Sequence, residues 1–271
     1  MHKQATRIYL DSRYALPDGS FDIPGGGIEC DPTDRVWLSE FSTVASWHTI
    51  DDTNQFMYVI EQTAPGVAAW NKRVIVLSPG PHDIDSLAAD ITTLLNGTGK
   101  HAAMGTYSCA RVSGGIGGGA GGQTNKSFYI TCTQGNFRLP DDALIRSEYG
   151  IQGLTFSTNS LFSFQFGGEV LPGHMSGFVD LRRCHNIFLH CPGFGSHNCI
   201  GPRGSRNILA KIPVDVPYGQ PVHLLFSGSD HDAIQAGVRA VSNLKIELRD
   251  VHGNGLDLNG GHWSCTLIFE R

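Results

Sequence analysis

Short runs that alternate apolar and polar residues recur along nearly the whole chain. In Leu244–Arg249 every second residue is apolar, so an extended strand there would have one apolar face. Clusters of Gly and Pro, such as Pro24–Gly27 and Gly201–Gly204, separate the runs and are typical of turns. The pattern predicts strands over 7–11, 35–44, 55–62, 72–77, 106–112, 127–133, 153–157, 161–166, 176–181, 186–191, 207–214, 222–226, 244–250 and 262–270.

One segment has helical spacing instead. Between Asp83 and Asn96 the apolar residues recur three and four positions apart, which places them on one face of a helix. Asp83 or Asp85 can cap its N-terminus and Gly97 can end it. The sequence therefore predicts an all-β sandwich with one short amphipathic helix at about 84–96.

Composition narrows the class of protein further. The chain has 271 residues, of which 34 are Gly and 13 are Pro, and only 17% are charged against 40% hydrophobic. Such a chain can bury a core, which excludes wholesale disorder, and it has no collagen repeat and no apolar run of bilayer length. The net charge of −5 without a basic stripe disfavours a dedicated nucleic-acid binder. The first residues lack the apolar stretch of a signal peptide, so we expect a protein made and kept inside a cell until assembly.

The organisation along the chain is that of one domain over 1–271, without an evident linker. A Gly-rich stretch at 113–123, containing Gly114–Gly122, predicts a loop. Because about 270 residues is large for a simple sandwich, an inserted or elaborated region is expected at about 98–180.

Three segments carry residues that could support chemistry. The cluster Cys184–Cys199 gathers Cys and His residues but has no CxxC pair, and its centre has the pattern of a strand that would splay the ligands apart. Asp250–Gly261 resembles a calcium loop but lacks the closing Glu, and it is expected to be a turn that pairs the strands Leu244–Asp250 and His262–Glu270 as an antiparallel hairpin. Asp230–Asp232 is expected to be a polar loop. No nucleophile elbow or phosphate-binding loop is present. The sequence predicts no catalytic residues, no cofactor and no metal site.

Several strand-and-turn motifs then occur in a fixed order. They begin with Asp11-Ser12-Arg13 and continue through Trp47 to a Pro-Gly turn that precedes the helix; the last extends from Asp250 to Trp263. Their residues are Asp11, Ser12, Arg13, Trp47, Asp51, Asn54, Pro79, Gly80, Asn96, Tyr218, Gly219, Asp250, Gly253, Asp257, Leu258, Asn259, Gly260 and Trp263. In this order the motifs resemble those of the minor capsid (penton) proteins of virophages, Polintons and polinton-like viruses.

The resemblance implies a single jelly roll of two antiparallel sheets and a structural, non-enzymatic role. It further implies a homopentamer that closes the fivefold vertices of an icosahedral virion, next to a double jelly-roll major capsid protein. A spike, a cement protein or a host receptor are additional possible partners. The basic residues Lys3, Arg7 and Arg13 could form an arm toward the capsid floor or genome, or a swapped or flexible terminus.

The alternative function is a β-sandwich module that binds a receptor or glycan, such as a spike or fibre head on a virion. Exposed aromatic residues would serve it, and the candidates are Trp37, Trp47, Trp70 and Trp263. Trp47 and Trp263 lie in strand-like segments and are expected in the core, so Trp70 is the best exposed candidate. An enzyme is the third and least favoured function, because no catalytic motif is present.

Overall fold

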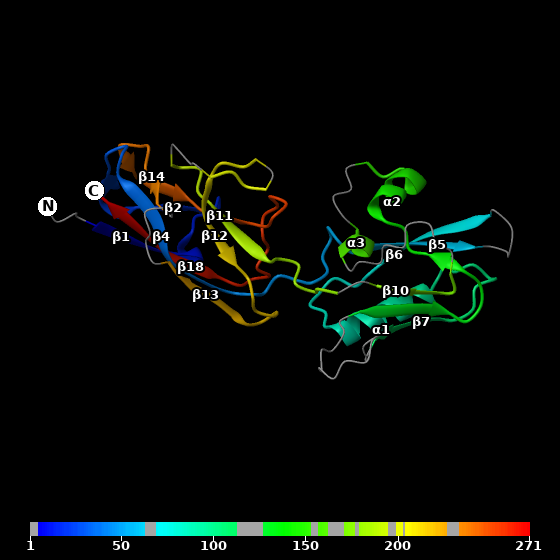
Figure 1. The fold of residues 1–271 in the computed structure, drawn as a ribbon. Helices are drawn as coiled ribbons and strands as arrows, with labels where there is room; N and C mark the ends of the chain where they lie inside the picture. Colours follow the sequence, from blue (N-terminus) through cyan, green and yellow to red (C-terminus); the bar gives the residue numbers. More distant parts are fainter. Residues whose placement is uncertain are drawn as a thin grey trace, which may run out of the picture. The chain divides into compact units, whose positions relative to one another are not determined.

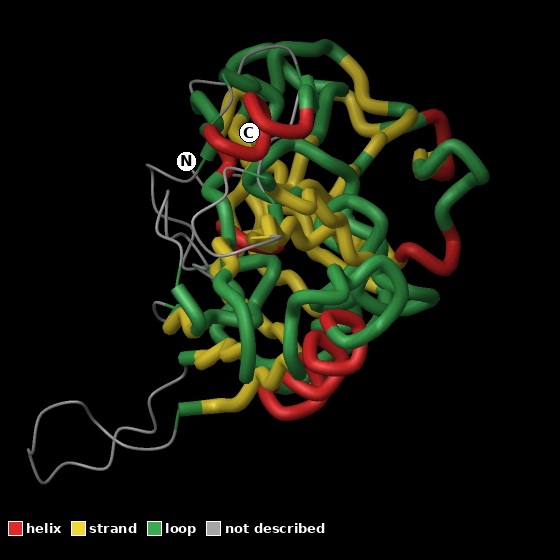
Figure 2. The backbone as a smooth tube through the Cα atoms, turned by 90° about the vertical axis from the view of Figure 1, so that its right-hand side faces the viewer, coloured by secondary structure: helices red, strands yellow, loops and turns green. Residues whose placement is uncertain are grey.

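The computed structural model describes residues 5–62, 69–112, 127–152, 157–161, 171–176, 179–194, 199–202, 204–226 and 233–271. The fold is predominantly β, with antiparallel sheets (Figures 1 and 2). Contacts divide the chain into two compact units. The first combines Met1–Trp47 with Cys184–Arg271, and the second is His48–Arg183.

The described residues of the first unit contain a five-stranded sheet, a three-stranded sheet and two two-stranded sheets. The five-stranded sheet has the strand order β1 (Ala5–Asp11), β18 (Trp263–Glu270), β4 (Arg35–Val44) and β13 (Pro221–Leu225), with β14 (Ile234–Gln235) also paired to β4. These strands lie side by side in Figure 1. β18 pairs with both β1 and β4 across more than 200 residues of the chain, for example Leu267 with Leu38.

The three-stranded sheet has the order β12 (Ile208–Pro213), β11 (Asn186–His190) and β17 (Glu247–Arg249), while β16 (Asn243–Lys245) pairs separately with β2 (Ser20–Asp22). β16 and β17 are two parts of one run, interrupted at Ile246: the first pairs with β2 and the second with β11. The short strands β3 (Ile28–Glu29) and β15 (Ala240–Val241) pair with each other.

The chain passes between these sheets in the order of a jelly roll. β1, β4, β13 and β18 belong to the five-stranded sheet, while β11, β12 and β17 belong to the three-stranded sheet, and the run from β17 continues into β16, which pairs with β2. The fold is thus a single jelly roll of two antiparallel sheets, as predicted. The whole second unit is inserted in the connection between β4 and β11.

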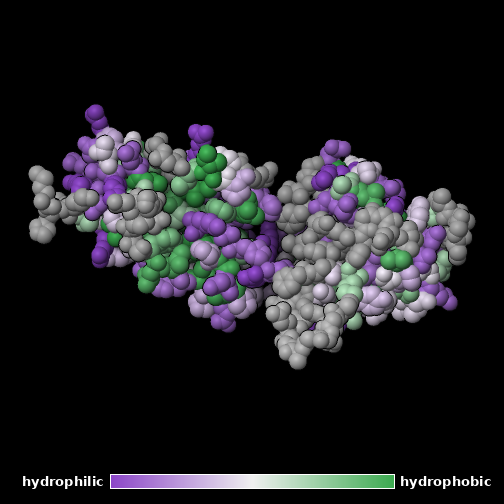
Figure 3. Space-filling model, viewed as in Figure 1, coloured by the Kyte–Doolittle hydropathy of each residue, from purple (hydrophilic) through white to green (hydrophobic). Residues whose placement is uncertain are grey.

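The core of the jelly roll is formed by the apolar side chains that alternate with polar ones along the strands. On β4, Val36, Leu38 and Phe41 are buried, and they meet Leu267 and Phe269 from β18 and Ile187 and Leu189 from β11 in one apolar cluster. Both sheets contribute their inner faces to this cluster, which is the arrangement of two sheets packed face to face. Other large apolar side chains, among them Leu225, Tyr9 and Tyr14, stay at the surface, where apolar and hydrophilic residues mix (Figure 3).

The second unit contains two three-stranded sheets. In one, β5 (Phe56–Gln62) lies between β6 (Trp70–Val76) and β9 (Phe137–Arg138). In the other, β8 (Phe128–Cys132) lies between β7 (Tyr107–Arg111) and β10 (Gly173–Met175).

Helix α1 (Ile84–Leu95) packs on β7 and β6 and buries Leu87, Ala88, Ile91 and Leu95. Its N-cap is Asp83, whose carboxylate accepts hydrogen bonds from the backbone N–H groups of Asp85 and Ser86. The predicted helix at about 84–96 is therefore confirmed. Two further helices, α2 (Asp142–Tyr149) and α3 (Thr158–Leu161), were not predicted.

Most predicted strands that fall on described residues are present with shifts of one or two residues at their ends. Two segments differ. The predicted strand over 244–250 is broken into two strands. The described part of 176–181 is not a strand; the strand in this region is Gly173–Met175. Most of 153–157 and of 161–166 lies outside the described residues, and the Gly114–Gly122 run does so entirely.

The domain organisation also differs from the expectation of one domain with an elaborated region at about 98–180. The second unit begins at His48, well before residue 98, because the chain crosses between the units only after Trp47 and after Arg183. Within the described residues, no helix has the length and hydropathy that a bilayer crossing requires.

Candidate functional site

The sequence motifs of the first unit gather at one end of the β1–β18–β4–β13 sheet. The register pairs Asp11 with Ser264, Trp263 with Thr43, and Val44 with Pro221. The end of β1, the start of β18, the end of β4 and the start of β13 therefore lie at the same end of the sheet. We call this region the motif end.

Asp11 and Ser12 fix the turn that follows β1. The Asp11 carboxylate accepts hydrogen bonds from the backbone N–H and the guanidinium of Arg13, at 2.5–3.2 Å, and caps a short 3-10 helix over Ser12–Tyr14. This side-chain hydrogen bond with Arg13 is the main reason why the pKa of Asp11 is lowered to about 2. The Ser12 hydroxyl accepts a hydrogen bond from the backbone N–H of Trp263 at 3.0 Å. The first and last motifs are thus joined directly.

Trp263 connects the two sheets of the jelly roll. Its ring meets Phe21 of β2 edge-on, with centroids 5.7 Å apart, and is stacked on Phe41 of β4 at 6.4 Å. Phe21 and Phe41 are buried, whereas Trp263 is half-buried. The indole therefore seals the core at the motif end, as expected for a core residue.

The closing motif is a connection between sheets rather than a hairpin, because β17 pairs with β11 while β18 pairs with β1 and β4. The Asp250 carboxylate accepts hydrogen bonds from the backbone N–H groups of His252 and Asn254, at 2.8 and 2.9 Å. Gly253 has a φ of 81°, and Arg249 donates to its carbonyl oxygen. The carboxylate that resembled a calcium ligand thus holds its own turn.

The second half of this motif needs left-handed backbone at two consecutive residues. Asn259 has a φ of 49° and Gly260 a φ of 78°, a region that favours Asn and Gly. The Asp257 carboxylate accepts the backbone N–H of Asn259 at 2.7 Å. Leu258 is buried in the core, and its carbonyl oxygen accepts the hydroxyl of Ser46, next to Trp47.

Gly219 completes the motif end. Its backbone N–H donates to the carbonyl oxygen of Ala45 at 2.8 Å, and its φ of 80° allows the turn before β13. Tyr218 beside it is exposed. Trp47 is buried in the core of the first unit, as expected.

The remaining motif residues, Asp51, Asn54, Pro79, Gly80 and Asn96, lie in the second unit and do not join the motif end. Asn54 is buried; its side chain donates to the carbonyl oxygen of Thr49 and accepts the N–H of Asp51. Asp51 also forms an ion pair with Arg183, whose guanidinium donates to Thr53. The first and last segments of the second unit are therefore held together.

Gly80, which follows Pro79, pairs with Ile50 through two backbone hydrogen bonds, N–H to O, of 2.9 and 3.1 Å. Asn96, the C-cap of α1, donates to the carbonyl oxygen of Tyr107 and accepts its N–H. The side-chain amide thereby extends the edge of β7 like a further peptide group.

Sequence reasoning missed a buried charged network in the second unit. Glu61 is fully buried and forms an ion pair with Arg73 at 3.2 Å. Its carboxylate also accepts the Tyr107 hydroxyl at 3.0 Å, the Asn71 amide at 2.7 Å and the backbone N–H of His101 at 3.0 Å. Burial, followed by the charge of Glu61, raises the pKa of Tyr107. The sequence signal that could have revealed this network is a Glu and an Arg at core-facing positions of adjacent strands.

The tryptophan that seemed most suited to glycan binding is occupied within the chain. Trp70 is half-buried, and the guanidinium of Arg138 lies 5.1 Å from its ring centroid. Trp37 on β4 is also half-buried. Neither side chain offers a fully open aromatic platform of the kind that the alternative function calls for.

The Cys and His residues at 184–199 do not form a metal site among the described residues. Cys184 and Cys191 lie in the jelly-roll core, all seven cysteines are free, and the described residues hold no cluster of three or more His, Cys, Asp or Glu side chains suited to a metal. His197 and Asp230–Asp232 lie outside the described residues.

Comparison with known proteins places this arrangement among solved folds. No family model and no curated protein matches the sequence. The structure is similar to the crystal structure of the mavirus penton protein, with a TM-score of 0.53 and 12% identity over 99% of each chain. A structure of the Sputnik virophage, determined by cryo-EM, has a TM-score of 0.48 and 10% identity, over 98% of this chain and 97% of that one. Over nearly its full length, and through both of its units, this chain therefore has the fold of the mavirus penton protein, which confirms at the level of the fold the resemblance seen in the motifs.

Proposed function

We propose that this chain is a structural capsid protein, a penton that forms homopentamers and closes the fivefold vertices of an icosahedral virion. The observation that carries the proposal is the similarity to the mavirus penton protein, which includes the jelly roll and the unit inserted in it over 99% of each chain. An unrelated sandwich would match the jelly roll alone.

The roles of the motif residues support a structural rather than a catalytic function. Asp11, Asp250 and Asp257 each accept backbone N–H groups of their own turns, and Gly219 donates to Ala45. Side chains committed to such contacts shape loops. In this proposal the chain has no catalytic role.

The jelly roll also has the asymmetry that a ring requires. Successive subunits of a closed ring use two different surfaces, one on each side. The two edges of the first sheet differ: β1 is seven residues long, whereas β13 has five and begins with Pro221. The proposed partners are further copies of the chain and, around the vertex, a double jelly-roll major capsid protein.

Native mass spectrometry and sedimentation velocity of the recombinant chain test the proposal. We expect a species of about five chains of 29.3 kDa, either alone or after addition of the major capsid protein. Cryo-electron microscopy of the particle should then show density for this chain at the fivefold vertices. A chain that stays monomeric in reconstituted capsids, or density elsewhere in the particle, would contradict it.

A further inference from the structure

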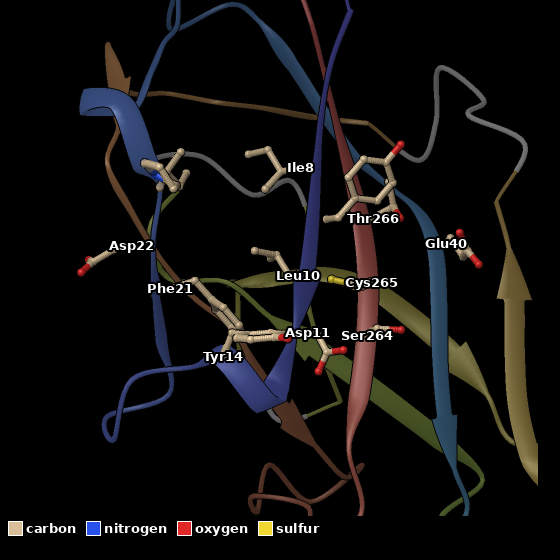
Figure 4. A pocket seen from close by; sticks show the side chains of 13 residues that line it. Ile8, Leu10, Asp11, Tyr14, Phe21, Asp22, Glu40, Ser264, Cys265 and Thr266 are labelled. Carbon is tan, nitrogen blue, oxygen red and sulfur yellow. The ribbon is translucent and has the colours of Figure 1, made fainter.

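An Asn that is followed by Gly is a place where a protein chain can modify itself. Asn is among the thermolabile residues, and the backbone nitrogen of a following Gly can attack its side-chain carbonyl carbon, because no Cβ hinders the approach. The chain has three such pairs: Asn96-Gly97, Asn254-Gly255 and Asn259-Gly260. The last two lie in the closing motif, Asp250–Trp263, which leads into β18 at the motif end, where Ser264 lies beside Asp11 (Figure 4).

The pair at the end of helix α1 is held in an unreactive arrangement. The side-chain amide of Asn96 donates to the carbonyl oxygens of Thr92 and Tyr107, at 2.9 and 2.8 Å, and its oxygen accepts the N–H of Tyr107 at 2.9 Å. The N–H of Gly97 donates to the carbonyl oxygen of Leu94 at 3.1 Å. Both reacting groups are therefore engaged, and a reaction would have to break their hydrogen bonds first.

The pair Asn259-Gly260 is exposed, but its backbone keeps the reacting groups apart. The φ values of 49° and 78°, with a hydrogen bond of 2.8 Å from the N–H of Gly261 to the carbonyl oxygen of Leu258, are those of a type I′ turn. In this turn the ψ of the first central residue is about +30°. The Asn side chain and the next nitrogen then lie on opposite sides of the Cα–C bond, so Asn259 must leave the turn before it can react.

The pair Asn254-Gly255 has neither kind of protection. Both residues are exposed, and Asn254 does not have the positive φ of Asn259. In the described part of the chain the N–H of Gly255 has no hydrogen-bond partner, and a Cβ added to Gly255 would meet no atom within 4 Å. The side-chain amide of Asn254 donates to the Asp250 carboxylate at 3.2 Å, and its backbone carbonyl oxygen accepts the N–H of Asp250 at 3.0 Å. The nitrogen that attacks is therefore the least restrained at this pair.

We propose that Asn254 is a site of spontaneous deamidation, at which the closing motif gains a negative charge as the protein ages. The Gly255 nitrogen attacks Cγ of Asn254 and loses its proton; the new C–N bond forms, the bond from Cγ to the side-chain nitrogen breaks, and ammonia leaves with that proton. Water then opens the cyclic imide at one of its two carbonyl groups, which gives aspartate or isoaspartate. Water is the only co-reactant. This modification goes beyond the proposed capsid function.

The new charge would lie next to Asp250, the residue that holds this turn. The Asp250 carboxylate accepts the backbone N–H groups of His252 and Asn254 and the side-chain amide of Asn254. A carboxylate at position 254 cannot donate this last hydrogen bond, and it repels Asp250. Isoaspartate also adds a methylene group to the backbone, shortly before the N–H of Leu256 that donates to Leu248. We therefore expect deamidation to loosen the turn.

Ageing of the full chain in mildly alkaline buffer, followed by peptide mapping with mass spectrometry, tests the proposal. We expect a mass gain of about 1 Da at Asn254, at least tenfold faster than at Asn96 and also faster than at Asn259. The product should be a mixture of aspartate and isoaspartate, because direct hydrolysis gives aspartate alone. In urea the three rates should converge, since each Asn is followed by Gly. Faster reaction at Asn96 or Asn259, aspartate as the sole product, or a tenfold preference that persists in urea would overturn the proposal.

Two variants locate the reaction and its consequence. Gly255→Ala keeps Asn254 but places a Cβ beside the attacking nitrogen, and it should slow the mass gain at least tenfold; an unchanged rate would refute the mechanism. Asn254→Gln removes the site. Hydrogen exchange at Asp250 and Leu256 should become faster in the aged chain and remain unchanged in aged Asn254→Gln, and circular dichroism verifies the fold of each variant. Equal exchange in both aged chains would refute the loosening of the turn.

Discussion

The jelly roll and the inserted unit His48–Arg183 differ in the side-chain contacts that stabilise their paired strands. In the jelly roll, β4 and β18 are brought together by apolar inner faces that include Phe41 and Leu267. In the inserted unit, β5 and β6 also share an apolar core, but the fully buried Glu61 and the buried Arg73 lie on them. One region relies on shape and burial, and the other adds a network of charges.

The two regions should therefore differ in how well they tolerate substitutions of buried residues. An apolar core tolerates exchange of similar side chains when the total volume is kept. A buried charge requires each of its hydrogen bonds, because the loss of one partner leaves a desolvated charge. We therefore expect the inserted unit to be the more sensitive to single substitutions at buried polar positions.

The largest effect is expected from Glu61→Ala. It leaves the Arg73 guanidinium buried without its carboxylate and should lower the free energy of unfolding of the inserted unit by about 3–5 kcal/mol. Urea denaturation followed by hydrogen exchange measures the loss and locates it. Glu148→Ala, which removes the half-exposed ion pairs of this carboxylate with Lys72 and Arg138, is the control and should cost about 0–1 kcal/mol. A loss below about 1 kcal/mol in Glu61→Ala would show that the network contributes no more than a surface pair.

Trp263→Ala tests the jelly roll in the same way. Removal of the indole deprives Phe21 and Phe41 of their common neighbour, and because the ring is half-buried we expect a cost of about 2–3 kcal/mol, below that of a fully buried Trp. Trp263→Phe keeps a ring at the site and should cost less than half as much. Thermal unfolding monitored by near-ultraviolet circular dichroism compares the two variants. Equal losses would mean that the backbone, and not the ring, seals this end.

A smaller effect is expected from Gly260→Ala. Its φ of 78° is strained for any residue with a Cβ, but no atom lies within 4 Å of the added methyl group, so the cost is that of the backbone alone, about 1–2 kcal/mol. Gly255→Ala, in the same connection, has open space and no positive φ, and should change the stability by less than about 0.5 kcal/mol. Chemical denaturation measures both. A neutral Gly260→Ala would indicate that the connection adjusts freely.

The reactivity of buried thiols compares the two units without any change to their stability. Burial raises the pKa of Cys109 in the inserted unit, and of Cys191 and Cys265 in the jelly roll, to about 12. At pH 8 only about one thiol in ten thousand is a thiolate, so these three should react with an aromatic disulfide far more slowly than the half-exposed Cys199, and faster as the pH rises.

In the Glu61→Ala variant, Cys109 should become reactive while Cys191 and Cys265 remain protected. Peptide mapping of the labelled sites separates the three. Simultaneous exposure of all three would mean that the two units unfold together.

The sequence predicted the features that depend on neighbours in the chain. Helix α1 follows from local spacing and from Asp83 as its cap, and long strands such as Arg35–Val44 follow from alternation. The three-residue β2 and the two-residue β3 are too short to show a period. Helix α2 spans eight residues, too few for the pattern to stand out.

Features that depend on distant residues could not be predicted in the same way. The insertion boundaries follow from the pairing of β4 with β18 and from the meeting of Asp51 with Arg183, which no local pattern reveals. Glu61 and Arg73 lie at core-facing positions of their strands, but the ion pair between them follows from the pairing of β5 with β6, which alternation alone does not show. Of the motif residues, Asp11 and Trp263 come together at the motif end because both belong to adjacent strands, whereas Asn96 belongs to the other unit.

The ion pair between Asp51 and Arg183 brings the two ends of the inserted unit together. For the jelly roll, the unit is then equivalent to a loop whose ends are already closed, and the entropy of closing a loop grows only slowly with its length. The connection between β4 and β11 is thus a position where whole modules can be exchanged, during evolution or by design, while the sandwich that carries them keeps its own core.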